Sequence, residues 1–62
     1  MPTITIALDQ MSEDKKKQLV AKLTKEAAAI TEYPEEYFFV YVQEYPKENI
    51  GVGGKTLKQI TG

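Results

Sequence analysis

Residues 1–8 read MPTITIAL, and the rest of the fold is built around this stretch. Apolar side chains recur at every second position after the proline, so Ile4, Ile6 and Leu8 fall on one face of an extended chain. β-Branched residues, which favour strands, make up most of positions 3–8. The pattern therefore predicts a β-strand from Thr3 to Leu8.

Pro2 is the strongest chemical signal in the chain. If Met1 is removed after synthesis, the ring nitrogen of Pro2 becomes a free secondary amine. An α-amino group has a pKa of about 8, and shielding from water disfavours its charged form. A modest downward shift then leaves a neutral amine that can act as a general base at pH 7. The alternative is a proline that is merely tolerated at the start of a strand.

The chain has 62 residues, which fits one domain over residues 1–62. A domain this small buries only about 60% of its unfolded surface. It contains neither cysteine nor histidine, so no disulfide supports it and the commonest metal ligands are missing. Its hydrophobic content of 42% is enough for a core with apolar residues to spare. We therefore expect a homo-oligomer, because small scaffolds without such supports usually associate.

The charge balance excludes some partners. Eight lysines and nine carboxylates give a net charge of −1, which is not the clustered positive charge that nucleic acid requires. Arginine is absent, so the planar fork that commonly clamps carboxylates is missing. No stretch resembles a secretory signal or is apolar for long enough to span a bilayer. We expect a cytoplasmic protein with neither a nucleic acid nor a membrane partner.

A helix is predicted after the first strand, with Ser12 as its N-cap and its end near Glu32. Pro34 closes it, because a proline disfavours the α conformation in the residue before it. Lysines cover much of the remaining surface, and we interpret them as a solvated face rather than an anion site. The apolar stripe of this helix consists of Leu19, Val20, Leu23, Ala27 and Ile30.

Residues 37–43 read YFFVYVQ and are apolar or aromatic at nearly every position. Such a strand is covered on both faces, and one helix can cover only one of them. The order strand, helix, strand makes a β-α-β unit with parallel strands and a right-handed crossover. Because two strands are too few for a stable sheet, we expect the sheet to continue into another copy of the chain.

Three glycines in positions 51–54 predict a tight hairpin near the C-terminus. The tripeptide Gly54-Lys55-Thr56 also matches the end of a phosphate-binding loop. That motif needs a glycine at position 49, where this chain has asparagine, and a helix of useful length after it. A hairpin is therefore favoured, with residues 56–60 as a short final strand or a tail.

Together these features resemble the 4-oxalocrotonate tautomerase family, over essentially the whole chain. The most specific segments are Met1-Pro2, the helix start from Ser12 to Lys16, and the glycine segment from Asn49 to Lys55. The resemblance implies an α+β fold, in which a β-α-β unit with a C-terminal hairpin forms half of a tautomerase or MIF-like unit. It also implies a cofactor-free isomerase that is a hexamer, built as a trimer of dimers. An amino-terminal proline, here Pro2, would move a proton between carbon and oxygen.

The chain departs from the family where substrate is bound. Typical members hold a dicarboxylate with one arginine just before the helix and another early in the second strand. Met11 (or Gln10, depending on a one-residue gap) and Phe39 stand at these positions, and Ile50 replaces a common aromatic residue. We therefore predict Pro2 as the catalytic residue and Phe39, Met11 and Ile50 as an apolar substrate-binding wall. Substrate preference should then differ from that for 2-hydroxymuconate.

Two other groups could supply the positive charge that binds a substrate carboxylate. Lys47 and Lys55 are candidates for contacting a substrate carboxylate, and a different subunit could supply arginines. The predicted function is a keto–enol tautomerase acting on a small enol or keto acid. The alternative, motivated by the missing arginines, is a non-catalytic oligomeric binding or structural protein on the same fold.

Overall fold

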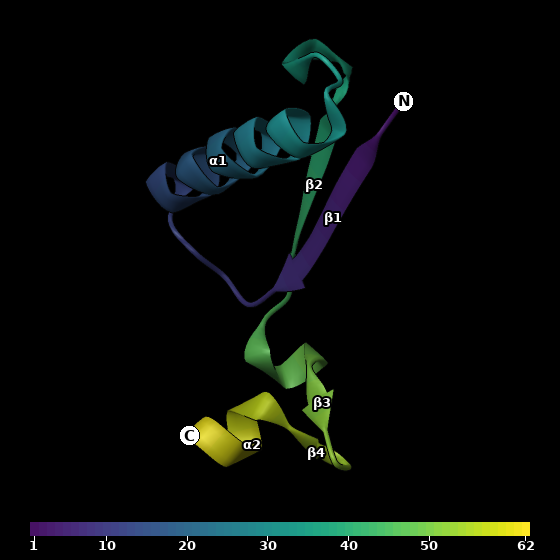
Figure 1. Cartoon of the computed structure of the whole chain (residues 1–62). Coiled ribbons are helices and arrows are strands. Elements are labelled where there is room, and N and C mark those ends of the chain that lie inside the picture. The colour runs from purple at the N-terminus through teal and green to yellow at the C-terminus, as the bar shows by residue number, and fades with distance from the viewer.

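Two parallel strands, β1 (Thr3–Leu8) and β2 (Phe39–Glu44), form the main sheet of the protein. The structure is a computed structural model that describes all 62 residues. The register of the two strands runs from Thr3 opposite Phe39 to Leu8 opposite Glu44. Helix α1 (Glu13–Thr31) connects the two strands and crosses one face of the sheet (Figure 1). The predicted β-α-β unit with parallel strands is confirmed. The first strand has the predicted bounds, whereas the second begins at Phe39 because residues 35–37 form a 3-10 turn.

Helix α1 begins and ends through its own polar groups. The side-chain oxygen of Ser12 accepts a hydrogen bond from the Lys15 N–H at 3.3 Å, as expected of an N-cap. At the other end, Glu32 takes a left-handed conformation with φ of 64° and donates its N–H to the Ala28 carbonyl at 2.9 Å. The helix therefore stops before Tyr33 and Pro34.

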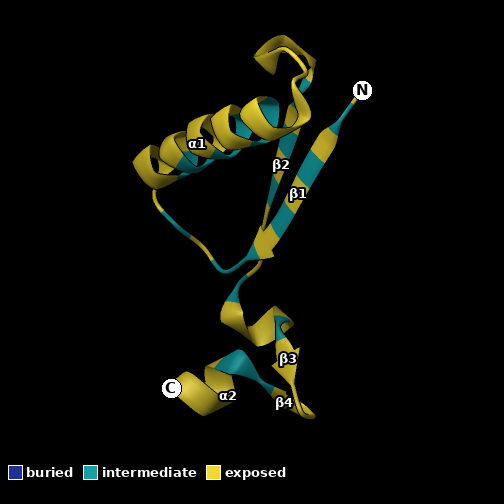
Figure 2. Cartoon of the chain, viewed as in Figure 1, coloured by how far each residue is buried: buried dark blue, intermediate teal, exposed yellow.

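The two faces of the main sheet differ in exposure, and the alternation is visible along both strands in Figure 2. The face that α1 covers is half-buried and carries Ile4, Ile6, Leu8, Val40, Val42 and Glu44. The opposite face, which we call the open face, carries Thr3, Thr5, Ala7, Phe39, Tyr41 and Gln43. Phe39 and Tyr41 are each 47% exposed, and no residue of the single chain is fully buried. The open face is therefore the one for which we expect a second copy.

The apolar stripe of α1 is shorter than predicted. Leu19, Leu23 and Ala27 are half-buried, but Ile30 is 80% exposed and Val20 is 37% exposed. A 19-residue helix is about 28 Å long, whereas a six-residue strand spans about 20 Å. Placing Ile30 in the stripe is therefore wrong: the last turn of the helix is not covered by the sheet.

The C-terminal segment forms an arm that extends from the end of β2, away from α1 (Figure 1). It contains a 3-10 turn at Lys47–Asn49 and a hairpin of β3 (Gly51–Val52) and β4 (Lys55–Thr56), which closes through Gly53 and Gly54 with φ of 61° and 89°. A short helix, α2 (Leu57–Thr61), follows instead of the predicted strand or tail.

A capping box begins α2. The Gln59 N–H donates to the Thr56 hydroxyl at 3.1 Å, and the Thr56 N–H donates to the Gln59 side chain at 2.8 Å. The Leu57 N–H also donates to the Ile50 carbonyl at 2.7 Å, which ties the helix to the hairpin. Neither α1 nor α2 combines the length and the apolar character that crossing a bilayer requires.

Candidate active site

Pro2 stands at the beginning of β1, where β2 holds its backbone. The Phe39 N–H donates to the Pro2 carbonyl at 3.1 Å, which continues the ladder of the sheet by one bond. The proline ring is half-buried, and the Met1 residue attached to its nitrogen is 80% exposed. Loss of Met1 would therefore leave a secondary amine at a strand end whose position the sheet fixes.

Phe39 is a backbone neighbour of Pro2, but its ring belongs to the open face. Alternate residues of a strand face opposite sides of the sheet, so the Phe39 side chain lies with its register partner Thr3. None of the clefts in the single chain is lined by Pro2 or Phe39. In the single chain, neither residue therefore faces a cleft that could hold a substrate.

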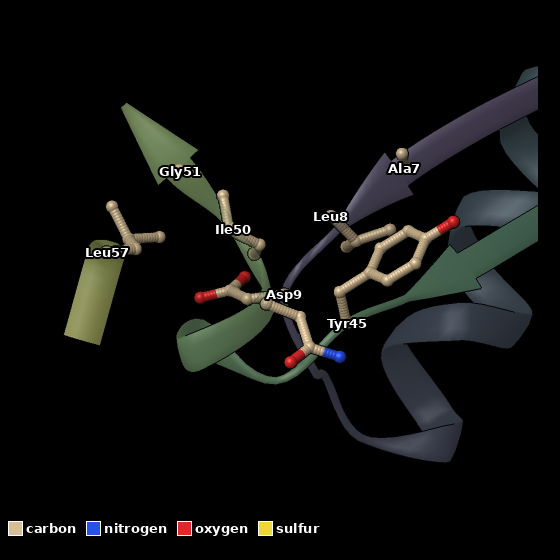
Figure 3. A pocket seen from close by; sticks show the side chains of 8 residues that line it. Ala7, Leu8, Asp9, Tyr45, Ile50, Gly51 and Leu57 are labelled. Atoms are coloured by element: carbon tan, nitrogen blue, oxygen red, sulfur yellow. The ribbon is translucent and has the colours of Figure 1, made fainter. Parts of the chain in front are cut away.

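Ile50 lines a cleft of about 550 Å³ at the opposite end of β1, which we call the arm cleft. In Figure 3 the side chains of Leu8, Ile50 and Leu57 come from three different segments: β1, the residue before β3, and the start of α2. The Tyr45 ring lies beside Leu8, and the Asp9 carboxylate lies near Ile50. The full lining is Ala7, Leu8, Asp9, Tyr45, Asn49, Ile50, Gly51 and Leu57.

The arm cleft is mainly apolar, and its one charged lining residue is the acid Asp9. Sequence reasoning found Ile50 but missed Leu8, Tyr45 and Leu57 as its neighbours. These residues are far apart in the sequence, and they meet because the Tyr45 N–H bonds the Leu8 carbonyl at 3.0 Å and the Leu57 N–H bonds the Ile50 carbonyl.

Met11 lies elsewhere, in a shallow groove of about 370 Å³ along α1 that is separate from the arm cleft. Its backbone is held by a residue that sequence reasoning missed. The Met11 N–H donates to Glu44 Oε2 at 2.9 Å, while Lys16 Nζ donates to Glu44 Oε1 at 2.8 Å. Both bonds lower the pKa of the Glu44 carboxyl below its ordinary value of 4.5, and the bond from Lys16 has the larger effect. The sequence did carry a signal for this role of Glu44: it is an acid that follows Val40 and Val42 at every second position and so lies on the same, covered face of the strand.

One chain therefore does not gather the predicted site residues. Leu8, at the end of β1, lines the arm cleft, and Pro2 lies six residues before it. Along an extended strand this separation is about 20 Å. Of the candidate lysines, Lys47 lines a polar cleft of about 390 Å³ together with Lys58 and two acids, and Lys55 is exposed in β4. Within one chain, Pro2, Met11 and Ile50 therefore lie at three separate places.

Known proteins that are similar to this chain identify its family. The family model described as tautomerase enzyme matches residues 2–60. The chain belongs to the 4-oxalocrotonate tautomerase family. A protein of Bacillus cereus named "Probable tautomerase" is 38% identical over 58 residues, covering 92% of this chain and 95% of the relative. The resemblance found in the sequence is thus confirmed.

Solved structures of the family agree. A 4-oxalocrotonate tautomerase isozyme from Methylibium petroleiphilum matches with a TM-score of 0.90 at 29% identity, covering 98% of this chain and 100% of that one. A heterohexameric 4-oxalocrotonate tautomerase from Chloroflexus aurantiacus matches with a TM-score of 0.88 at 28% identity, covering 97% and 98%. The tautomerase α+β fold is confirmed, and membership of the family supports an isomerase activity of the tautomerase type.

Proposed function

We propose that the protein is a cofactor-free keto–enol tautomerase in which the free amine of Pro2, exposed by loss of Met1, acts as the general base. The observation that carries this proposal is the placement of Pro2. It follows the first residue, its backbone is fixed by β2, and it is the first residue that the tautomerase family model matches. A neutral amine on a strand end needs no long side chain to be held still.

The reaction is a proton transfer within one molecule. The Pro2 nitrogen takes the proton from the enol hydroxyl, the oxygen becomes a carbonyl, and the carbon–carbon double bond electrons accept a proton at carbon. The amine returns to its neutral form when it gives up that proton, so no oxidant, reductant or other reactant is consumed. In the chain with Met1 attached, the Pro2 nitrogen is an amide and cannot do this.

The site is completed, in this proposal, by a second copy of the chain. Pro2 lines no cleft of its own chain, and the arm cleft lies at the other end of β1. Bringing the Pro2 end of one copy to the arm cleft of another encloses the amine and covers apolar surface. The open face and the absence of any fully buried residue support an oligomer. We propose a homohexamer, a trimer of dimers; the Chloroflexus aurantiacus relative is itself a heterohexamer.

The lining of the arm cleft bears on substrate preference. Leu8, Ile50 and Leu57 offer apolar contact, and Asp9 would repel a carboxylate placed near it. No arginine exists anywhere in the chain to pair with a second carboxylate. We therefore propose that monocarboxylate or uncharged enols with an apolar substituent are preferred to dicarboxylates such as 2-hydroxymuconate.

The test is turnover of the enol of phenylpyruvate and of 2-hydroxymuconate by the Met1-free protein and its Pro2→Ala variant. We expect the variant to lose about a hundredfold in kcat, the lower end of a general base's contribution, because alanine leaves a primary amine in place. Pro34→Ala, at an exposed proline in the loop after α1, is the matched control and should keep the parent rate. Equal rates for parent and Pro2→Ala would contradict the mechanism, and negligible turnover by both would favour the non-catalytic alternative.

A further inference from the structure

Glu44 is the last residue of β2 and the only charged side chain on the face of the sheet that α1 covers. Its two carboxylate oxygens have separate partners: Oε2 accepts from the Met11 N–H at 2.9 Å and Oε1 accepts from Lys16 Nζ at 2.8 Å. The Lys16–Glu44 contact is the only ion pair in the structure. The carboxylate thus bonds two segments that lie 33 and 28 residues earlier in the chain.

The connection that contains Met11 and the strand end that carries Glu44 both adjoin the arm cleft. Met11 belongs to the connection between β1 and α1, and Asp9 at the start of that connection lines the cleft. On the strand side, Glu44 pairs in register with Leu8 and is followed by Tyr45, and both neighbours also line the cleft. The carboxylate therefore ties the connection to the strand ends that form one wall of the cleft.

We infer that Glu44 is a positioning residue, which holds the Asp9–Met11 connection in place and thereby sets the shape of the substrate cleft. This inference rests on the proposed function. Hydrogen bonds to an ionised group are shorter and stronger than neutral ones. The Lys16 and Glu44 side chains are 35% and 25% exposed, so solvent screening keeps the effect moderate. Because Pro2 lies at the other end of β1, substrate binding should respond rather than proton transfer.

The experiment compares Glu44→Gln with Glu36→Gln, a substitution at an exposed acid in the 3-10 turn before β2. We expect KM for the enol of phenylpyruvate to rise about threefold to tenfold in Glu44→Gln, with kcat within about twofold of the parent. Lys16→Gln should act in the same direction, and Lys17→Gln, at an exposed neighbouring lysine, should leave KM unchanged.

Hydrogen exchange of the Met11 amide is measured on the same proteins, because this readout does not depend on turnover. Exchange should be faster in Glu44→Gln and Lys16→Gln than in the parent, and unchanged in the two controls. The positioning role would be overturned if Glu44→Gln left either the Met11 exchange rate or KM unaltered. It would also be overturned if kcat fell by as large a factor as KM rose and the oligomer was lost. Failure of the proposed function is recognised separately, as a parent rate that Pro2→Ala does not lower.

Discussion

Substitution of Tyr41 by alanine should weaken the oligomer. Tyr41 lies at the centre of the open face and leaves 47% of its surface exposed in the single chain. An aromatic side chain buries about 150–250 Å² when fully covered, so about 90 Å² of Tyr41 remains for a second copy to cover. At about 25 cal/mol per Å², covering it contributes about 2 kcal/mol per copy. The dissociation constant should then rise about thirtyfold for each copy that contributes its Tyr41.

The assay is sedimentation velocity over a dilution series into the low micromolar range. The parent should sediment far above its 7.0 kDa chain mass, and Tyr41→Ala should dissociate at higher concentration. Tyr33→Ala is the matched control, because Tyr33 is 54% exposed but lies after α1 rather than on the sheet. A parent that stays folded as a monomer, or a variant that dissociates no earlier than the parent, would refute the reasoning about the open face.

Three further results are expected. The rate of enol turnover should rise with pH through a single ionisation below the usual α-amino pKa of about 8, and a flat profile from pH 5 to pH 9 at unchanged fold would contradict a free Pro2 amine. Phe39→Arg should raise kcat/KM for 2-hydroxymuconate about tenfold to a hundredfold more than for an uncharged enol, because a charge-assisted bond contributes about 1.5–3 kcal/mol. Equal changes in kcat/KM for the two substrates would mean that Phe39 does not face the substrate. Because folding lowers the pKa of Glu44, its stabilising contribution is present above pH 4.5 and is lost as the pH falls through the folded-state value. The difference in thermal midpoint between parent and Glu44→Gln should therefore shrink under acid conditions, and a constant difference would count against it.

The parts of the fold that local pattern determines were predictable. Alternation placed both ends of β1, and the Ser12 cap placed the start of α1. Helix α2 was not predicted, although its capping box, Thr56 with Gln59, is readable in the sequence. Five residues are too few for an independent helix, and α2 depends on the tertiary bond between Leu57 and Ile50.

The candidate site was predictable only residue by residue. Pro2 is distinguished by chemistry that does not depend on the fold, so the sequence alone identified it as a candidate. The separation of Met11 from Ile50 depends on where the arm leaves β2, which no periodicity encodes. Glu44 was overlooked because a single acid at the end of an apolar strand is usually read as a solvent-facing residue, whereas here its partners come from the connection and α1.

The most direct test of Pro2 as the base compares two chemically synthesised chains that differ only by Met1, which a chain of 62 residues allows. Intact mass confirms each preparation, and sedimentation confirms that both assemble alike. Turnover of the enol of phenylpyruvate is then measured for both. We predict turnover by the chain that begins at Pro2. We predict a rate near the uncatalysed one for the chain that retains Met1, because its Pro2 nitrogen is an amide. Equal turnover by the two chains would contradict the role of Pro2 as the base.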